Sequence, residues 1–519
     1  MVLYISVELQ FNLSLLQLEG YNYFTFLKTK YKNYKVAPIN FSFIVILIVS
    51  SFLFNNIFIY LYFVYTLFYV FYCIYLLCKH KGIKRYICTK KIFRFYVVFY
   101  FVLLLSISMV IMSYINNLMT LLLICVTLSP YCVAIMSFVF ILIFDIFLMK
   151  NYIKKSKSKI ETNNVKIIAI TGSYGKTSVK HILYEMLLKK YNVVMTPKSF
   201  NTPAGICKFV NGTDFRNVDY FIVEMGAKKC GEIKELCKIF KPQYGILTSI
   251  AEQHLDTFKT LGNIFKTKCE LQDNIQENGL MVFNCFNEYV KKAQAKFSGD
   301  KICVGVSSDV WYENYSFNNG VPSFDIITKN DNDSLSSGFN CDVNNLSKIS
   351  VDTKLIGEHN SVNIILAFAL AKRLGVEEAN IIDAISNLSP IESRLEVKRI
   401  ANNVTILNNG YNSNPYSARC SLKVLNEYTL PKIVVTPGFV EMGKKQYELN
   451  YHFGKDIAKV ANSVFIVNMV NKKALTNGLI DAGFNMTNVE YYNHFKDIDF
   501  SKLSNCVVLI ENDLPSNYV

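Results

Sequence analysis

A phosphate-binding loop is the clearest chemical signal in the sequence. An apolar strand ending at Thr171 runs directly into Gly-x-x-Gly-Lys-Thr, which begins at Gly172. Glycines let backbone N–H groups turn toward phosphate oxygens, Lys176 adds a positive charge, and the Thr177 hydroxyl can hold Mg²⁺. The amphipathic stretch 181–188 follows, so the loop opens a helix whose N-terminus adds positive field. The predicted nucleoside triphosphate site comprises Gly172, Ser173, Gly175, Lys176, Thr177 and Ser178.

Three further side chains with catalytic or metal-binding chemistry follow this loop along the chain. Glu224 ends the apolar strand 220–223, so it is expected at the carboxyl edge of a sheet, where an open α/β fold binds its ligand. His254 follows the end of the next expected strand, and Lys268 lies on a downstream helix. Taken singly, each residue also has an ordinary structural interpretation: Glu224 as a strand-end cap, His254 as a histidine with its hydrogen bonds satisfied, and Lys268 as a solvated helical lysine.

The composition limits the kind of protein that carries this site. Of 519 residues, 51% are hydrophobic, and the mean hydropathy of +0.23 is too high for a purely soluble enzyme. The net charge of +15 is uneven, because residues 1–160 carry +13 and residues 161–519 carry +2. Basic residues between long apolar runs are typical of membrane topology, which excludes nucleic acid as a partner. The 14 scattered cysteines are expected to be reduced thiols.

Residues 1–160 are predicted to form a membrane region. Apolar stretches run from 41 to 78 and from 96 to 149, each longer than the roughly 20 residues that one span needs and best interpreted as a pair of spans, two short ones in the first stretch. Basic clusters flank both stretches, and the positive-inside rule then predicts about four transmembrane helices with cytoplasmic flanks. A fifth span stays open as an alternative, because 118–149 has room for two short helices around Pro130.

From residue 165 onward, short apolar strands alternate with amphipathic helices, which predicts α/β domains with parallel sheets. A stretch near 300–355 is rich in Asn, Asp and Ser and predicts a small β insertion. A second α/β pattern begins near Arg394. The clearest expected strands are Val165–Thr171, Tyr220–Glu224, Tyr244–Ile250, Lys432–Thr436, Val464–Val467 and Val507–Ile510.

The order of these motifs resembles the Mur ligase family, the enzymes that build the peptidoglycan stem peptide. The phosphate loop agrees with a narrow family, because two residues separate its glycines where the common loop has four. The similarity points to the UDP-N-acetylmuramoyl-tripeptide:D-alanyl-D-alanine ligases and their membrane-anchored relatives. The matching segments are 171–178, 199–205, 223–227, 247–256, 267–271, 357–363, 393–396 and 410–415, with 436–443 and 511–515 resembling the anchored relatives.

The resemblance implies a membrane region followed by two Mur ligase domains. Residues 1–160 would hold the α-helical spans, and residues 161–392 would form the central P-loop domain that binds ATP. Residues 393–519 would form a Rossmann-like C-terminal α/β domain. The implied location is the bacterial cytoplasmic membrane, as a multi-pass protein with its catalytic domains in the cytoplasm.

The resemblance also implies how phosphates and metal ions are held. Lys176 would contact the β- and γ-phosphates of ATP, and Thr177 with Glu224 would hold one Mg²⁺. His254 and Lys268 would serve a second metal ion. CO₂ would convert Lys268 into a carbamate, which explains how a lysine can act as a carboxylate-like ligand.

Four further residues match motifs that contact the nucleotide. His359, Asn360 and Asn363 match the segment that packs against adenine, and Arg394 matches the hinge arginine that approaches the γ-phosphate when domains close. The implied reaction phosphorylates a substrate carboxylate to an acyl phosphate, which an amine then attacks to form an amide. The expected partners are ATP, a muropeptide cell-wall precursor, an amino acid or dipeptide amine, and membrane lipid. A lipid-linked precursor is favoured over a UDP-linked one, because membrane spans stand where the family has the domain that grips the UDP-sugar.

Two asparagines depart from the family pattern. Asn408 and Asn409 stand where the family usually has a pair of aspartates that help position the nucleotide or the amine. This departure keeps an alternative open, a non-ligating, membrane-anchored nucleotide-binding scaffold of cell-wall synthesis. On the ligase interpretation, aspartates restored at both positions are expected to speed turnover. An ATP-driven transporter is a poor third interpretation, because four spans with one intramembrane acid offer little pathway.

Overall fold

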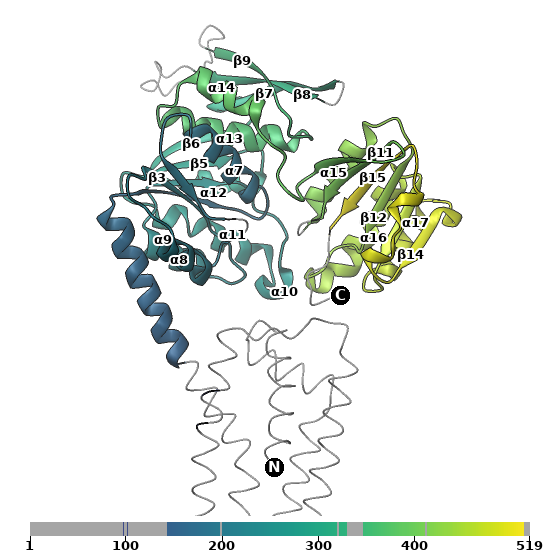
Figure 1. The fold of residues 1–519 in the computed structure, drawn as a ribbon, viewed down its shortest axis with the longest axis horizontal. Coiled ribbons are helices and arrows are strands. Elements are labelled where there is room, and N and C mark those ends of the chain that lie inside the picture. The colour runs from purple at the N-terminus through teal and green to yellow at the C-terminus, as the bar shows by residue number, and fades with distance from the viewer. Residues whose placement is uncertain are drawn as a thin grey trace, which may run out of the picture. The chain divides into compact units, whose positions relative to one another are not determined.

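The computed structural model describes most of the chain after residue 142. The described residues are Val97, Phe101 and 143–197, 200–318, 321–329, 346–410 and 413–512. Residues 151–514 form one compact unit that contains both of the β-sheets described below (Figure 1).

The first sheet has nine strands and carries the phosphate loop at its centre. Its strands, in spatial order, are β2 (Val193–Met195), β3 (Tyr220–Glu224), β1 (Lys166–Thr171), β4 (Tyr244–Leu247), β5 (Leu280–Asn284), β6 (Asp300–Val304), β7 (Val310–Asn318), β8 (Val321–Lys329) and β9 (Leu346–Asp352). Strands β2 to β6 run parallel, so their carboxyl ends meet at one edge. The sequence prediction of β3 is confirmed, and β1 and β4 are confirmed with shorter bounds.

Helices cover both faces of this sheet (Figure 1). One face packs against helices α7, α13 and α14, which share a core with β1 and β3. On the other face, an aromatic cluster around Phe221 of β3 includes Phe209, Phe215 and Phe240. Strand β1 is therefore buried on both sides, as its unbroken apolar run predicts. The helices are α7 (Lys176–Leu187), α8 (Pro203–Gly212), α9 (Glu232–Phe240), α10 (Leu255–Phe258), α11 (Leu261–Cys269), α12 (Glu288–Gln294), α13 (His359–Arg373) and α14 (Glu378–Asn387), with a 3-10 turn at Gln272–Asn274.

The region expected to hold a β insertion extends this same sheet. Strand β7 follows β6, and β7, β8 and β9 pair antiparallel as a meander at one side of the sheet. Inward residues of the meander, among them Phe324 and Ile326, pack into the core that also holds α13 and α14. The meander thus enlarges the core that supports the helix carrying His359.

The second sheet has six strands. Their spatial order is β10 (Glu396–Ile400), β11 (Val404–Asn409), β15 (Cys506–Glu511), β12 (Lys432–Thr436), β13 (Ser463–Val467) and β14 (Val489–Tyr492). Only β10 pairs antiparallel, so the carboxyl ends of the other five also share an edge. The helices are α15 (Pro415–Asn426), α16 (Gln446–Ala458) and α17 (Lys472–Asp481), with 3-10 turns at Gly443–Lys445, Met486–Asn488, Phe495–Asp497 and Phe500–Lys502.

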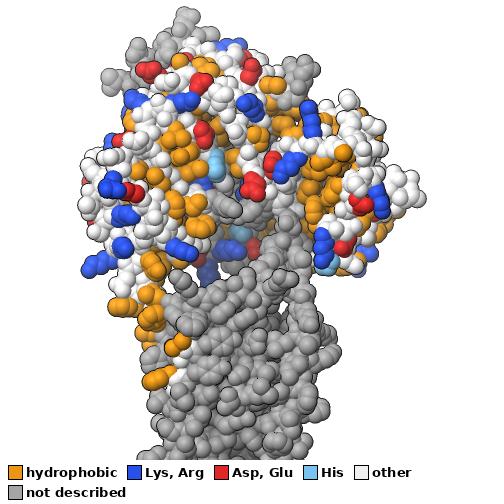
Figure 2. Space-filling view, in the orientation of Figure 1, with side chains coloured by type: hydrophobic (Ala, Val, Ile, Leu, Met, Phe, Trp, Pro, Cys, Tyr) orange, Lys and Arg blue, Asp and Glu red, His pale blue; other side chains and the backbone are white. Residues whose placement is uncertain are grey.

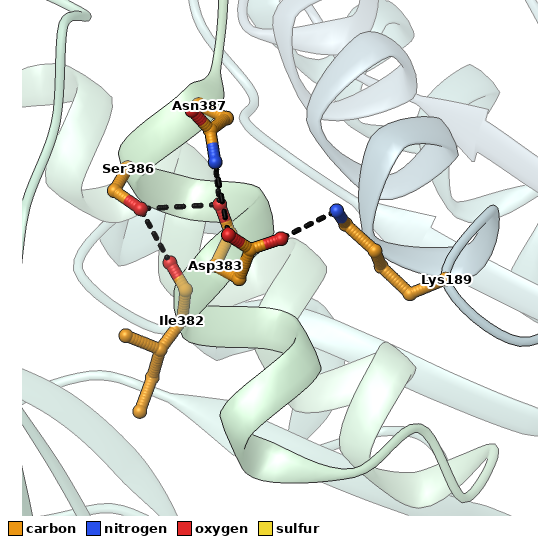
Figure 3. Close-up of polar contacts among 5 residues, drawn as sticks. All are labelled: Lys189, Ile382, Asp383, Ser386 and Asn387. Atoms are coloured by element: carbon orange, nitrogen blue, oxygen red, sulfur yellow. Dashed lines mark hydrogen bonds and ion pairs between the residues drawn. The ribbon is translucent and has the colours of Figure 1, made fainter.

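An ion pair joins helix α14 to the segment that follows α7 (Figure 3). Lys189 Nζ lies 2.5 Å from Asp383 Oδ2, and Asn387 Nδ2 donates to the same aspartate at 3.0 Å. Nearby, Tyr191 donates its hydroxyl to Leu374 O at 2.6 Å. These contacts are exposed or half-buried and individually weak; Lys189 ties α14, and Tyr191 ties the end of α13, to the segment that follows α7.

The prediction of a multi-span membrane region at 1–160 is wrong for the part of that region which the structure describes. None of the described helices is both long enough and apolar enough to cross a bilayer. The described helix over 143–162 carries five lysines between Lys150 and Lys159, whereas a span needs about 20 predominantly apolar residues. The location in the cytoplasmic membrane, which depended on those spans, is corrected with it. The other residues of 1–160 lie outside the described residues.

Charges on the compact unit are mixed. On the face seen in Figure 2, lysine and arginine side chains are interspersed with acidic ones. This mixture agrees with the charge of only +2 over residues 161–519.

Candidate active site

The phosphate loop leaves β1 and curls into α7 in a conformation that requires its glycines. Gly175 has φ +83°, in the left-handed region that glycine adopts most easily, and a Cβ there would lie 2.9 Å from Asn363 Oδ1. A Cβ at Gly172 would lie 2.1 Å from Thr248 Oγ1. The loop is therefore packed so closely on its neighbours that larger residues do not fit at either position.

Residues just beyond β4 form a cradle under this loop. Thr248 and Ser249 donate their hydroxyls to Tyr174 O at 2.5 and 2.9 Å, and Ser249 Oγ accepts from Tyr174 N at 2.8 Å. Ser173 donates its hydroxyl to Ala251 O at 3.0 Å. The loop conformation is thus held by hydrogen bonds before any ligand contributes. Sequence reasoning missed these roles and assigned 248–250 to the strand.

Lys176 lies at the first position of α7 and folds back over the loop. Its ammonium donates to Gly172 O at 2.8 Å and to Ser173 O at 3.2 Å. Burial lowers the pKa of Lys176 to about 8, with the Glu224 carboxylate opposing this and Arg394 reinforcing it. A cation held against the loop backbone is placed to meet phosphate oxygens that the loop binds.

Thr177 and Glu224 form the pair expected to hold a metal ion. Thr177 Oγ1 donates to Glu224 Oε2 at 3.0 Å, and Glu224 is buried at the end of β3. The same oxygen accepts from Lys180 Nζ at 3.2 Å, and Asn201 Nδ2 lies 3.4 Å from the other carboxylate oxygen. A hydroxyl and a carboxylate beside a phosphate loop are the oxygen ligands that Mg²⁺ prefers. Lys180, which sequence reasoning missed, keeps this carboxylate compensated.

Lys268 lies at the end of α11 and is buried. Burial, reinforced by the nearby Lys176 ammonium, lowers the pKa of Lys268 to about 7. Near neutral pH a large fraction of this lysine is therefore a free amine. This is the form that reacts with CO₂, so its environment suits the carbamate that the family resemblance implies.

His254 precedes α10 in a left-handed conformation with φ 51°. Its Nδ1 lies 2.5 Å from Oε2 of Glu441, a residue in the loop after β12. The hydrogen bond with His254 holds the pKa of Glu441 at about 2, with burial opposing it and Lys228 adding to it. Glu441 thus reaches His254 from the second sheet. Sequence reasoning noted the segment 436–443 but gave Glu441 no role.

A cavity of about 310 Å³ collects most of the predicted site residues. Arg394 also lines it, and the charge of Arg394 is felt by Lys176 and by Glu511. The predicted residues on its wall are Ser173, Gly175, Lys176, Thr177, Ser178, Glu224, His254, Lys268 and Arg394. Residues separated by more than 200 positions in sequence therefore line the same cavity.

The expected adenine-contacting residues do not line this cavity. His359 is half-buried at the start of α13, burial lowers its pKa to about 4, and its buried Nδ1 finds no hydrogen-bond partner among the described residues. Asn360 donates to Ile356 O at 2.8 Å, and Asn363 donates to Asn360 Oδ1 at 3.0 Å. Asn363 nevertheless borders the phosphate loop, through its approach to Gly175.

The two asparagines at the end of β11 have different surroundings. Asn408 is half-buried, and its amide donates to Ser393 Oγ at 3.4 Å. Asn409 is buried and donates to both carboxylate oxygens of Glu511, at 3.1 and 3.0 Å, on the neighbouring strand β15. Glu511 also accepts from Ser413 and Ser421. A buried carboxylate therefore lies beside the position where the family pattern has an aspartate.

Comparisons with known proteins agree on one family. The model of the Mur ligase middle domain matches residues 170–371. A UDP-N-acetylmuramoyl-tripeptide–D-alanyl-D-alanine ligase of Borreliella burgdorferi is 30% identical over 312 residues, covering 59% of this chain and 61% of the relative. The enzyme of the same name from Buchnera aphidicola is 26% identical, with 60% of this chain and 65% of the relative covered. The chain thus spans less than two thirds of the length of these two relatives.

Solved structures show the same fold. A MurF crystal structure from Acinetobacter baumannii has a TM-score of 0.59 at 21% identity, covering 70% of this chain and 77% of that one. A MurF ligase from Thermotoga maritima in complex with ADP also has a TM-score of 0.59 at 21% identity, covering 70% and 80%. Residues 170–371 thus match the Mur ligase middle domain, and the chain resembles the UDP-N-acetylmuramoyl-tripeptide–D-alanyl-D-alanine ligases.

Proposed function

We propose that this protein is an ATP-dependent ligase that joins a carboxylate and an amine into an amide through an acyl phosphate. The observation that carries the proposal is the single cavity lined by the phosphate loop, Glu224, His254, Lys268 and Arg394. Phosphoryl transfer needs positioning and charge compensation more than covalent chemistry. A hollow with several cations, a buried carboxylate and a helix N-terminus supplies both.

The phosphate loop and α7 would bind the nucleotide. Backbone N–H groups of the loop and the Lys176 ammonium would hold the β- and γ-phosphates. Magnesium would be held by Thr177 and Glu224, where it would neutralise charge on the transferring phosphoryl group. Their separation of 3.0 Å supports this assignment, because both oxygens can face one ion. Lys180 would continue to compensate the Glu224 carboxylate.

His254 and Lys268 would serve a second metal ion, Lys268 as its carbamate. The buried position of Lys268 and its pKa of about 7 support carbamylation, since the free amine is the reactive form. Carbamylation removes a buried cation beside Lys176 and leaves an anion able to ligate magnesium. Arg394 would approach the γ-phosphate from the linker that leads into the second sheet.

For the substrates, we propose a UDP-muramoyl peptide as the carboxylate donor and D-alanyl-D-alanine as the amine. The names of the relatives from Borreliella burgdorferi and Buchnera aphidicola support this choice. A lipid-linked precursor and membrane lipid, both expected from the sequence, are not part of the proposal. They followed from the predicted spans, which the described helices do not supply.

The test is phosphate release by the purified full-length chain with ATP, Mg²⁺, UDP-muramoyl tripeptide and D-alanyl-D-alanine, with the amide product identified by mass. Release that requires both substrates, and that Lys176→Ala abolishes, supports the ligase. ATP binding without release on any muropeptide and amine combination would favour the non-ligating scaffold instead. Asn408 and Asn409 made that alternative worth testing, whereas Glu511 beside Asn409 weakens its basis.

A further inference from the structure

Two loops from different sheets meet beside the cavity. The first loop, 251–256, follows the strand β4 region and carries His254, and the second, 437–445, follows β12 and carries Glu441. Besides the His254–Glu441 contact, Asp256 N donates to Glu441 O at 3.3 Å. Lys445 Nζ lies 2.6 Å from Glu252 Oε1. The second sheet therefore touches the proposed metal-binding loop at several points.

The backbone at the centre of this contact is unusual. His254 and Glu441 both have positive φ, 51° and 62°, although neither is a glycine. Such conformations are strained for residues other than glycine and persist where the surroundings hold them. Each of these bends lies at a residue whose side chain makes the interloop hydrogen bond. Gly443 completes the fit, because a Cβ there would lie 3.3 Å from Asp256 Oδ1.

The contact uses Nδ1 of His254, and no described residue hydrogen-bonds its Nε2. His254 lines the cavity, whereas Glu441 does not, so Glu441 reaches the imidazole from outside the cavity. A carboxylate that accepts from Nδ1–H fixes the tautomer in which Nε2 carries the lone pair. Histidine ligands of metal ions usually have such a carboxylate or carbonyl behind them, and removal of this partner typically costs 10–100-fold in metal affinity.

We propose that Glu441 is a positioning residue that aims His254 Nε2 at the second metal ion and couples docking of the second sheet to completion of that metal site. The inference rests on the proposed function, since His254 must serve a metal. Glu441 acts through His254 and does not itself line the cavity; its other carboxylate oxygen lies 3.5 Å from Lys228 Nζ. The first metal, at Thr177 and Glu224, does not depend on it.

Manganese binding tests this without relying on turnover. The full-length protein, with a non-hydrolysable ATP analogue and bicarbonate, is titrated with Mn²⁺ while free Mn²⁺ is followed by electron paramagnetic resonance. The wild type is expected to bind two ions. Glu441→Ala should weaken the second ion by 10–100-fold and leave the first unchanged. Glu441→Gln keeps an acceptor oxygen without charge and should fall between the two.

Lys445→Ala is the matched control, because it breaks a neighbouring interloop contact without touching His254. It should bind both ions as the wild type does, and should keep kcat, whereas Glu441→Ala should lose kcat with little change in KM for ATP. Equal losses in Glu441→Ala and Lys445→Ala, or wild-type Mn²⁺ affinity in Glu441→Ala, would overturn the inference and leave an ordinary interloop ion pair.

His254→Ala separates this failure from a failure of the proposed function. If His254→Ala loses the second ion and Glu441→Ala does not, the metal assignment stands and the positioning role falls. If His254→Ala binds both ions normally, His254 is no metal ligand, and both the second-metal assignment and the role of Glu441 are wrong.

Discussion

Replacement of the buried Asn409 by aspartate, opposite the buried Glu511, tests how this pair stabilises the second sheet. The two residues are paired partners on β11 and β15, and the Asn409 amide donates to both Glu511 oxygens at 3.0–3.1 Å. Both side chains are buried, with 4% of Asn409 and 0% of Glu511 exposed. Asn409→Asp replaces the donor by an acceptor, so two carboxylates face each other away from water. We expect a large loss of stability rather than the faster turnover that the family pattern suggested.

The size of the stability loss in Asn409→Asp follows from the lost hydrogen bond and from the new repulsion between the two carboxylates. A hydrogen bond to a charged acceptor contributes about 1.5–3 kcal/mol, and two like charges about 4 Å apart repel by about 4 kcal/mol at an effective dielectric of 20. Uptake of a shared proton limits the total, so we expect a loss of about 3–5 kcal/mol at pH 8, as for other broken buried pairs.

The pH dependence has a definite sign. Burial already raises the pKa of Glu511 to about 7, and a second carboxylate raises the pKa of the pair further. A raised folded pKa means that stability is present at low pH and is lost as pH rises through that pKa. Between pH 8 and pH 6 the variant should gain up to about 2.7 kcal/mol, two units at 1.36 kcal/mol each, while the wild type gains about half of that because its Glu511 has a pKa of about 7. The penalty of Asn409→Asp should therefore shrink by up to about 1.4 kcal/mol.

Thermal unfolding of the full-length chain at both pH values measures this. At roughly 4 °C per kcal/mol, Asn409→Asp should lower the unfolding temperature of the less stable region by about 12–20 °C at pH 8. The double variant Asn409→Asp, Glu511→Gln restores one amide facing one carboxylate and should recover more than half of the loss. Wild-type stability of the single variant at pH 8, or a double variant worse than the sum of the singles, would refute the reasoning.

Three further outcomes are expected from the first sheet. Lys176→Ala should abolish phosphate release without lowering the unfolding temperature, since this lysine is buried with a pKa lowered to about 8; a large drop in stability would show a structural role. Lys268→Ala should lose activity, and bicarbonate with a short carboxylate should restore part of it in a phosphate assay, whereas full activity of the variant would exclude the carbamate. Gly175→Ala should weaken ATP binding at least tenfold in a titration, because its Cβ would meet Asn363. Gly231→Ala is the control, since it shares a positive φ, 92°, but has no atom within 4 Å of the added Cβ; equal losses of affinity would refute the steric argument.

Periodicity predicted the strands of both sheets well, for a physical reason. Central parallel strands such as β1 and β3 are buried on both faces, so they read as unbroken apolar runs between turns. The end of β4 was harder to predict. Residues 248–250 are apolar or small enough for a strand, but the Thr248 and Ser249 hydroxyls hydrogen-bond the phosphate loop instead.

The site residues that the sequence did not predict were missed for a different reason. Glu441 and His254 are 187 positions apart, and Asn409 and Glu511 are 102 apart. Each carboxylate looks like an ordinary solvated acid in its own segment, and only the packing of the two sheets reveals its partner. Lys180 could not be predicted because, in the amphipathic pattern of its helix, a buried lysine cannot be told from an exposed polar residue.

The central claim is that a substrate carboxylate is activated by phosphorylation inside this cavity. A UDP-muramoyl tripeptide labelled with ¹⁸O in its terminal carboxyl tests it directly, with ATP, Mg²⁺ and D-alanyl-D-alanine present. An acyl phosphate leaves one carboxyl oxygen on the released phosphate, so mass spectrometry should find one ¹⁸O in the phosphate for each amide formed. Phosphate released without ¹⁸O would contradict this account.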